Sequence, residues 1–279
     1  MGSEMCIRDR DQLDRHSHLS DSTDAFQREA SVDEGSIIRS LTDGERYKSF
    51  LSDHVDDPDI NLTYTWAMDA LQFFRTSKYQ ATPVYLKINE IKDTKKKNEI
   101  LCVGVWYGKG KTNSRSFLKP IINVLNEVMQ CGINWRGRVF RFFPILGCFD
   151  AVQKADLQCI QQFNGAFGCG ACYHPGKRVK KGRGFTNVYP YNETPHPRRT
   201  MAEAIEISKH LANAGCSHID GIRGESCLSS LNGFDFILDA PPDPLHQLYL
   251  GVTKLTFFHA CLISTGLCTC TACLSSQLF

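Results

Sequence analysis

Residues 137–165 read GRVFRFFPILGCFDAVQKADLQCIQQFNG and join an apolar, aromatic run to an amphipathic one at Asp150. The first run, 137–150, has the aromatic and β-branched content of a buried strand. In the second run apolar residues recur at helical spacing, which predicts a helix that Gly165 stops. The residues on its predicted apolar face are Val152, Ala155, Cys159, Ile160 and Phe163. The segment therefore predicts a strand, an aspartate at the end of that strand, and a helix.

Three further strands and a helix are predicted before this segment. The strands are LTYTWAMDALQFF (62–74), TPVYLKINEI (82–91) and EILCVGVWYG (99–108), which polar connectors separate, and we expect a meander. Residues 116–134, SFLKPIINVLNEVMQCGIN, have the apolar spacing of a helix, with Gly132 as its stop. The order β-β-β-α-β-α predicts an α/β fold in which the fourth strand returns to a mixed sheet through a helical crossover.

The composition after residue 165 is different. CGACYHPGKRVKKGRGF (169–185) predicts a turn-rich basic hairpin or knuckle, and residues 200–214 predict a helix. We divide the chain into a flexible leader, a catalytic-type core, a region with CxxC and DxxH motifs, and a tail that we expect to be a truncated or misread end. Their ranges are 1–57 (with 1–10 expected to be an artefact of cloning or transcript assembly), 58–165, 166–254 and 255–279.

Composition and charge exclude several classes of protein. The chain has 279 residues, 42% hydrophobic and 22% charged, which excludes wholesale disorder. Its net charge of +2 gives no global attraction to nucleic acid, so any such binding needs a local patch. The polar N-terminus has no apolar signal region, so we expect the 13 cysteines to be mostly reduced and intracellular. Ser, Thr and Cys scattered through the tail argue against a membrane span.

Asp69 and Asp150 are the candidate catalytic residues. Asp69 lies within the first predicted strand and Asp150 ends the fourth, so the two carboxylates converge if these strands are neighbours. Such oxygen ligands suit Mg²⁺ or Mn²⁺, which assist phosphoryl transfer. The alternative is that both are ordinary aspartates at strand ends and turns.

Cys169 and Cys172 form the strongest local metal motif, a CxxC in a glycine-containing turn. Two thiolates provide half of a tetrahedral Zn²⁺ site. His174 is too close to Cys172 to be a comfortable ligand, so we expect His246 to be the third ligand, while the fourth is not identified. A redox CxxC is the rival interpretation, although the pair does not open a helix after a strand.

A cluster of positive charge follows the CxxC directly and is the candidate nucleic-acid contact. It can follow a phosphate backbone, and the alternative is a solvated loop. Its proximity to a zinc turn and a carboxylate pair favours nucleic acid. The residues are Lys177, Arg178, Lys180, Lys181 and Arg183.

Several stretches together resemble the transposases of CACTA (En/Spm)-type DNA transposons and the related animal transposase domain-containing proteins. The resemblance covers roughly 58–255, and its most specific parts are the block from the aspartate through CxxC to HPG and the DxxH followed by GV. The stretches are SKYQATPVYLKINEI (77–91), NEILCVGVWYGKGKTNSRSFLKPIINVL (98–125), FDAVQKADLQCIQQFNGAFGCGACYHPG (149–176), GIRGESCLSSLNGFD (221–235) and DPLHQLYLGVTKL (243–255).

The resemblance implies an RNase H-like (retroviral integrase-type) fold with two aspartates and a later glutamate as its acidic triad. Asp69 takes the first place and Asp150 the second, with Asp156 as the nearest competitor for the second. The family's cysteine and [C/D]xxH motifs correspond here to Cys169, Cys172, Asp243 and His246, as a zinc-knuckle insertion with helices.

For function, the resemblance implies a nuclear protein that binds double-stranded DNA, cleaves it at element ends with Mg²⁺, and transfers strands, working as a multimer. No glutamate follows Glu225, and Glu225 itself precedes the DxxH motif, so we expect this chain to be truncated and inactive. The alternative is a host-captured, non-catalytic zinc protein that binds DNA or other proteins. A third hypothesis is a redox or metal-handling protein that uses its many thiols.

Overall fold

A computed structural model describes residues 40–73, 78–91, 100–243, 246 and 249. The chain divides into two compact units, 1–241 and 242–279, and each is described by itself. All the helices and strands below lie in the first unit. In the described part of the chain, no helix has the length and apolar character needed to cross a membrane. The predicted tail, 255–279, lies outside the described residues.

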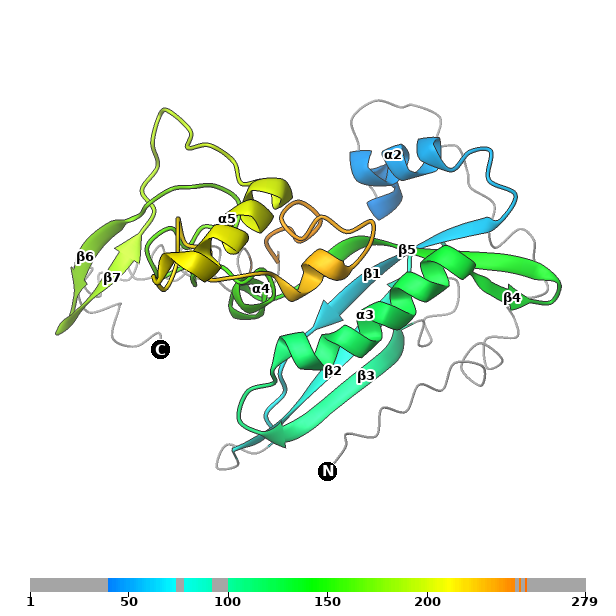
Figure 1. The fold of residues 1–279 in the computed structure, drawn as a ribbon, viewed down its shortest axis with the longest axis horizontal. Helices are drawn as coiled ribbons and strands as arrows, with labels where there is room; N and C mark the ends of the chain where they lie inside the picture. The colour runs from blue at the N-terminus through cyan, green and yellow to red at the C-terminus, as the bar shows by residue number, and fades with distance from the viewer. Residues whose placement is uncertain (1–39, 74–77, 92–99, 244–245, 247–248, 250–279) are drawn as a thin grey trace, which may run out of the picture. The chain divides into compact units, whose positions relative to one another are not determined.

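A five-stranded mixed sheet forms the centre of the first unit (Figure 1), in the order β3-β2-β1-β5-β4. β1 pairs antiparallel with β2, and β2 with β3, so the predicted meander is confirmed. β5 returns beside β1 in parallel, and β4 pairs antiparallel with β5. The predicted α/β class with a mixed sheet and a helical crossover is therefore confirmed. The strands are β1 (Ile60–Met68), β2 (Tyr79–Ile88), β3 (Ile100–Lys109), β4 (Ile133–Trp135) and β5 (Arg138–Cys148).

Helix α3 (Ser114–Cys131) makes the crossover between β3 and the β4–β5 pair, and lies across one face of the sheet (Figure 1). Asn113 caps it by accepting from the backbone N–H of Ser116. Gly132, with φ of 70°, ends the helix as predicted. A Cβ at Gly104 of β3 would lie 2.7 Å from Ile121 Cδ1, so the absence of a side chain there lets α3 approach the sheet closely.

Strand β4 was not predicted. It joins β5 through Arg136 and Gly137, which have φ of 52° and 77°. Positive φ at both central residues is the conformation of a type I′ hairpin turn, which matches the twist of paired strands. The residues before β5 therefore add an edge strand instead of serving only as the end of α3.

The helix predicted to run to Gly165 is wrong in its length. Helix α4 spans only Ala151–Leu157, because Cys159 has φ of 55°, which no α-helix tolerates. Tertiary contacts hold the chain in this turn: the carbonyl of Cys159 accepts from Arg223 N–H, and Ile160 forms a β-bridge with Ile222. As a result Ile160 is buried, whereas Phe163, which was expected on the same helical face, is exposed.

Part of the predicted flexible leader is helical. Helix α2 spans Glu45–Asp53 and buries Tyr47 and Phe50. The ring of Phe50 lies 5.0 Å from that of Phe143 on β5, measured between centroids. The leader prediction was wrong for this part because it relied on the polar average of the stretch, and two aromatic side chains suffice to attach one short helix.

The region after residue 165 shares its core with the sheet. It contains the hairpin strands β6 (Lys177–Lys181) and β7 (Gly184–Val188), helix α5 (Met201–Ala214) and a 3₁₀ helix η4 (Cys227–Ser230). Buried residues from 204–240 belong to the same apolar cluster as β1, β2 and α3. The expected boundary at 165/166 therefore does not separate two cores. The buried residues are Ala204, Ile222, Leu228, Leu231, Phe234, Phe236, Ile237 and Ala240.

Glu90, just past β2, makes a testable contribution to pH-dependent stability. Its carboxylate accepts from Thr63 N–H at 2.9 Å and from Thr63 Oγ at 2.7 Å. Burial raises the pKa of Glu90, and these hydrogen bonds lower it by less. Because the folded pKa exceeds the unfolded one, the stabilisation is complete below the unfolded pKa and is lost as pH rises through the folded pKa.

We therefore expect the free energy of unfolding of wild type, minus that of Glu90→Gln, to fall as the pH rises above 4.5, the ordinary pKa of a glutamate side chain. The glutamine is a neutral isostere, so the difference isolates the ionisation of this one carboxyl group. Urea unfolding at each pH provides the measurement. A difference that rises with pH would contradict the assignment.

Candidate metal and nucleic-acid sites

Asp69 and Asp150 lie at the same edge of the sheet. β1 pairs in parallel with β5, and the last pair of residues in this register is Ala67 with Cys148. Asp69 comes two residues after Ala67, and Asp150 comes two residues after Cys148. Neighbouring strands are about 4.8 Å apart. β1 ends at Met68, so Asp69 lies one residue beyond the strand in which it was predicted. The topology thus brings the two predicted residues to adjacent positions.

Asp150 also has a structural task, since it caps α4. Its Oδ1 accepts from the backbone N–H of Gln153 at 2.6 Å. An ionised carboxylate accepts several hydrogen bonds or metal contacts through its two oxygens, so one bond from Gln153 leaves capacity for a cation. The cap also holds the side chain at the strand end, because capping restricts its rotamer.

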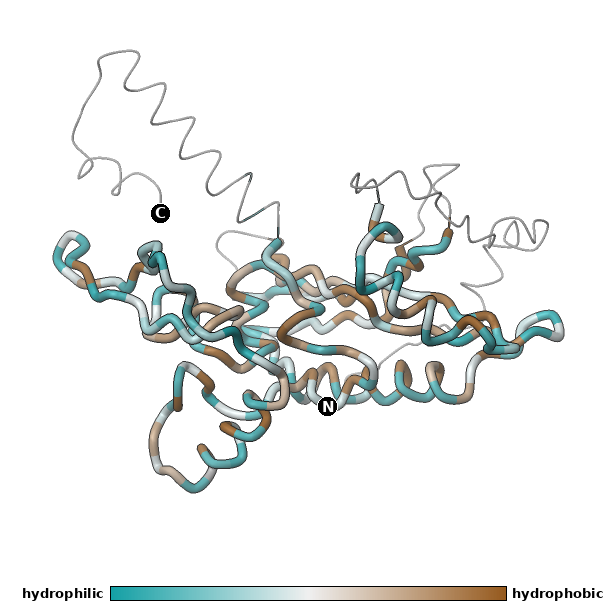
Figure 2. The backbone as a smooth tube through the Cα atoms, turned by 90° about the horizontal axis from the view of Figure 1, so that it is seen from above, coloured by the Kyte–Doolittle hydropathy of each residue, from teal (hydrophilic) through white to brown (hydrophobic). Residues whose placement is uncertain are grey.

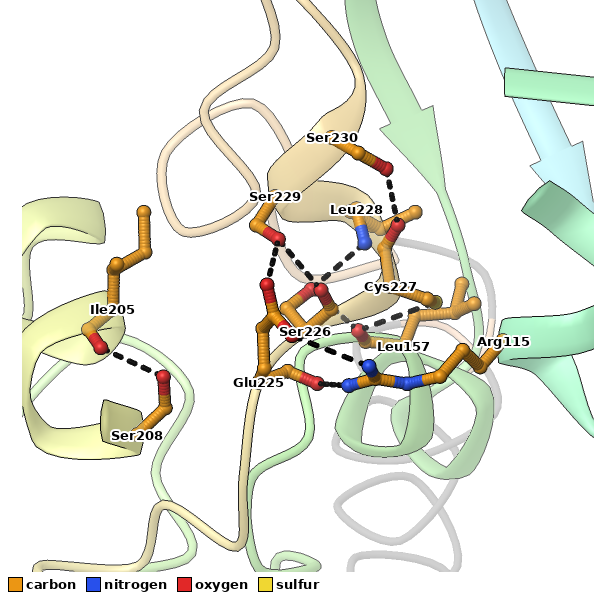
Figure 3. Close-up of polar contacts among 10 residues, drawn as sticks. All are labelled: Arg115, Leu157, Ile205, Ser208, Glu225, Ser226, Cys227, Leu228, Ser229 and Ser230. Carbon is orange, nitrogen blue, oxygen red and sulfur yellow. Dashed lines mark hydrogen bonds and ion pairs between the residues drawn. The ribbon is translucent and has the colours of Figure 1, made fainter. Parts of the chain in front are cut away.

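The other carboxylates of this region have partners of their own. Asp156, the competitor for the second position, lies inside α4 and accepts from Ser114 Oγ at 2.6 Å. Glu225 forms an ion pair with Arg115, with Oε2 3.2 Å from Nη1, and accepts from Ser229 Oγ at 3.4 Å (Figure 3). Within the described residues, no three side chains of His, Cys, Asp or Glu are grouped closely enough to hold one metal ion.

We call residues 169–172 the cysteine turn. The sulfur atoms of Cys169 and Cys172 lie 3.5 Å apart. Two ligands at 2.3 Å from a tetrahedral Zn²⁺ ion would be about 3.8 Å apart, so the pair fits two corners of such a site with little movement. Both cysteines are half-buried free thiols, as all eight cysteines in the described part of the chain are free. Burial raises the pKa of the Cys172 thiol, and its hydrogen bond from the backbone opposes that shift.

Arg199 braces the cysteine turn, and sequence reasoning missed it. Its side chain is 1% exposed. Nε donates to the carbonyls of Cys169 (2.8 Å) and Cys172 (3.1 Å), and Nη2 donates to those of Phe167 and Asp220, both at 2.8 Å. Its guanidinium also lies over the ring of Tyr173, 4.3 Å from the centroid. One buried cation therefore holds four backbone carbonyls around the two thiols.

Lys154 is a second buried cation at this turn. It lies on α4 and is 8% exposed. A Cβ placed on Gly170 would be 3.4 Å from Lys154 Cε and 3.8 Å from its Nζ, so the ammonium lies against the backbone between the two cysteines. Burial lowers the pKa of Lys154, and the charge of Cys169 opposes the shift.

The histidines have different environments. His174 accepts from Gly176 N–H at 2.8 Å through Nδ1, so its Nε2 carries the proton and donates to the carbonyl of Pro190 at 3.1 Å. Both ring nitrogens are thus engaged, which agrees with its exclusion as a ligand. His246 belongs to the second unit, where its Nδ1 pairs with the carboxylate of Asp243. Its assignment as the third zinc ligand stays a prediction.

The basic cluster lies on a β-hairpin, which is one of the two structures, hairpin or knuckle, that we predicted for residues 169–185. Its basic side chains are exposed: those of Lys177, Arg178, Lys180 and Lys181 on β6, and that of Arg183 in the turn before β7. Figure 2 shows the end of this hairpin mainly in the hydrophilic colour. Arg178 lies over the ring of Phe185, 4.6 Å from its centroid. No Asp or Glu occurs between Asp156 and Glu193, so no acidic residue of this stretch offsets the positive charge.

The base of the hairpin is attached to the cysteine turn. The hydroxyl of Tyr189, just past β7, accepts from Gly168 N–H at 2.6 Å. Cys172 forms a β-bridge with Arg198, and Tyr173 N–H donates to the carbonyl of Pro197 at 3.0 Å. These contacts join the residues before and after the hairpin, so the position of the basic surface depends on the turn.

A scan against models of protein families gave no match to this chain, and no curated protein matches it. The candidate sites therefore rest on the geometry of this chain alone.

Proposed function

We propose that this chain is a transposase-like DNA-processing protein with an RNase H-like core. The observation that carries the proposal is the parallel pairing of β1 with β5, which brings Asp69 and Asp150 to one edge of the sheet. The proposed core requires an antiparallel meander, a helical crossover and then a parallel strand that an aspartate follows, and here these are β1–β3, α3, and β5 with Asp150. The cysteine turn follows the second aspartate, as it does in the proposed family, and the basic hairpin comes directly after the turn.

The carboxylate edge suits a Mg²⁺ ion that is shared with DNA. Mg²⁺ in nucleic-acid enzymes is commonly held by one or two carboxylates, several waters and the substrate phosphates. Asp69 and Asp150 would supply the two carboxylates, and a backbone phosphate would complete the site. When bound, the ion would supply Lewis-acid activation of the phosphodiester and of the attacking water or 3′-hydroxyl. The protein's own part is to fix both carboxylates at the strand ends.

The hairpin would supply the DNA contact. Its exposed Lys and Arg side chains can neutralise phosphates, which is the main source of affinity for duplex DNA. Zn²⁺ at Cys169 and Cys172 would stabilise the turn to which the hairpin is attached. The proposed arrangement thus divides the work: the sheet edge binds the cation, and the hairpin binds the DNA backbone.

A DNA-binding measurement with isosteric variants tests this proposal. Asp150→Asn keeps a good helix cap for α4 while it removes the charge, since Asn caps helices as well as Asp does. We expect Mg²⁺ to raise the affinity of the wild-type chain for a fluorescent duplex by roughly tenfold, which is about 1.4 kcal/mol, in fluorescence anisotropy. Asp150→Asn and Asp69→Asn are expected to abolish that increase and to leave binding without added Mg²⁺ unchanged.

Two outcomes would count against the proposal in different ways. A chain that does not bind duplex DNA at all would overturn it. DNA binding that is insensitive to Mg²⁺ and to both substitutions would favour the alternative function, a non-catalytic zinc protein that binds DNA.

A further inference from the structure

Two buried cations lie at the cysteine turn, and no ion pair with a carboxylate balances their charge in the described part of the chain. Lys154 and Arg199 are both buried, and in the described part of the chain neither forms an ion pair with Asp or Glu. Burying a cation without an anionic partner is costly. The four carbonyls that bind Arg199 accept only from Nε and Nη2, and they carry no net charge. Its Nη1 is buried with no hydrogen-bond partner among the described residues.

The group that can become an anion beside Lys154 is Cys169, and beside Arg199 these groups are Tyr173, Cys169, Cys172 and Asp220. Lys154 lies against Gly170, between Cys169 and Cys172, and Arg199 binds the carbonyls of both cysteines. Zn²⁺ binds cysteine as the thiolate, and its charge of +2 offsets those of two thiolates. What a neighbouring ammonium favours is the deprotonated form of the sulfur, which is the form that zinc requires. Groups that contact ligands without touching the metal often tune its affinity by 10- to 100-fold, in order of magnitude.

We propose that Lys154 is a positioning residue for zinc: its ammonium, seated against Gly170, stabilises Cys169 and Cys172 as thiolate ligands. The inference rests on the zinc turn of the proposed function and extends it to a residue outside both motifs. Lys154 also connects the two candidate metal sites, because its backbone N–H bonds to the carbonyl of Asp150 at 2.8 Å. Metal at the turn would thereby hold the first turn of α4, which begins at the carboxylate edge.

The test is zinc affinity of the full chain, measured by competition with a chromophoric chelator after the metal has been removed under reducing conditions. Lys154→Met keeps the length of the side chain and removes the charge. We expect wild type to bind one zinc ion at the turn, and Lys154→Met to bind it roughly 10- to 100-fold more weakly. Lys119→Met, the same change at an exposed lysine of α3, is the matched control and should bind as wild type does.

A merely structural role for Lys154 predicts a different pattern. If Lys154 serves the zinc ligands, zinc-free Lys154→Met should unfold at the same temperature as zinc-free wild type or higher, because a buried charge has been removed. In the cobalt(II)-loaded protein, the thiolate-to-cobalt absorption should titrate at a higher cobalt concentration than in wild type. Unchanged zinc affinity, or a thermal destabilisation that is equal with and without zinc, overturns the inference.

Lys154→Gln decides the question if Lys154→Met does not fold. Glutamine removes the charge but keeps a polar end on an aliphatic stem at the position beside Gly170. Weaker zinc binding by this variant supports the inference, and unchanged binding overturns it. Wild-type protein that binds no zinc overturns the zinc turn and the inference together, whereas normal zinc binding by wild type and Lys154→Met alike overturns the inference alone.

Discussion

Trp66→Ala is expected to reduce the free energy of unfolding by about 4 kcal/mol, the usual cost of removing a buried aromatic side chain. Trp66 lies on β1 and is 2% exposed. Its ring meets those of Phe149 and Phe234 edge to face, with centroids 4.7 Å and 5.7 Å apart. Among the described residues its indole N–H has no hydrogen-bond partner. The truncation therefore leaves no acceptor unpaired, and the expected cost comes from lost packing.

The position of Trp66 also connects the core to the candidate site. Phe149 immediately precedes Asp150, so the packing of its ring helps to hold that aspartate at the sheet edge. Urea unfolding measures the loss, and Trp66→Phe, which keeps an aromatic ring, should lose markedly less. A loss below about 1 kcal/mol for the alanine variant would mean that the interior rearranges to fill the space, contrary to the close packing described.

Neutralising the hairpin is expected to produce the largest effect on DNA binding. The variant replaces Lys177, Lys180, Lys181 and Arg183 with Gln, and keeps Arg178 because its stack on Phe185 supports the hairpin. We expect a loss of affinity for duplex DNA of roughly 100-fold at low salt. The slope of log affinity against log salt should fall by about 0.9 for each phosphate contact that is lost, and so by 3 to 4 in all.

Anisotropy titrations over a range of salt concentrations give both quantities. A matched control replaces four exposed lysines outside the hairpin with Gln: Lys48, Lys87, Lys109 and Lys119. The control is expected to change the slope little. If both variants reduce affinity equally, the contact is non-specific and the hairpin is not the DNA-binding element.

Periodicity predicted the sheet and its helices well, because the decisive signals were local. The three apolar runs before α3, and the run that ends at Asp150, needed no distant partner to be interpreted. The order of elements also predicted that the last strand returns to the sheet through a helical crossover, but it left open whether that strand would be the neighbour of β1. The structure shows that β5 lies parallel beside β1, and this pairing places Asp69 and Asp150 at one edge.

The errors arose where tertiary contacts override local pattern. The end of α4 depends on Arg223 and Ile222, which lie more than 60 residues away, so helical spacing beyond Leu157 gave no sign of it. Arg199 follows three prolines, Pro190, Pro195 and Pro197, and this local pattern gives no sign of burial. Lys154 lies off the predicted apolar face of its helix. A lysine four residues after a strand-end aspartate carries no signal of burial until the cysteine turn is placed beside it.

The central claim is that Asp69 and Asp150 hold one divalent cation together with DNA, and iron-mediated cleavage tests it most directly. Fe²⁺ replaces Mg²⁺ in the complex with duplex DNA, and ascorbate and peroxide generate hydroxyl radicals at the bound ion. The account predicts that the polypeptide is cut near residues 69 and 150, and that excess Mg²⁺ or Asp150→Asn suppresses both cuts. Cuts confined to other parts of the chain, or cuts that persist in Asp150→Asn, would contradict it.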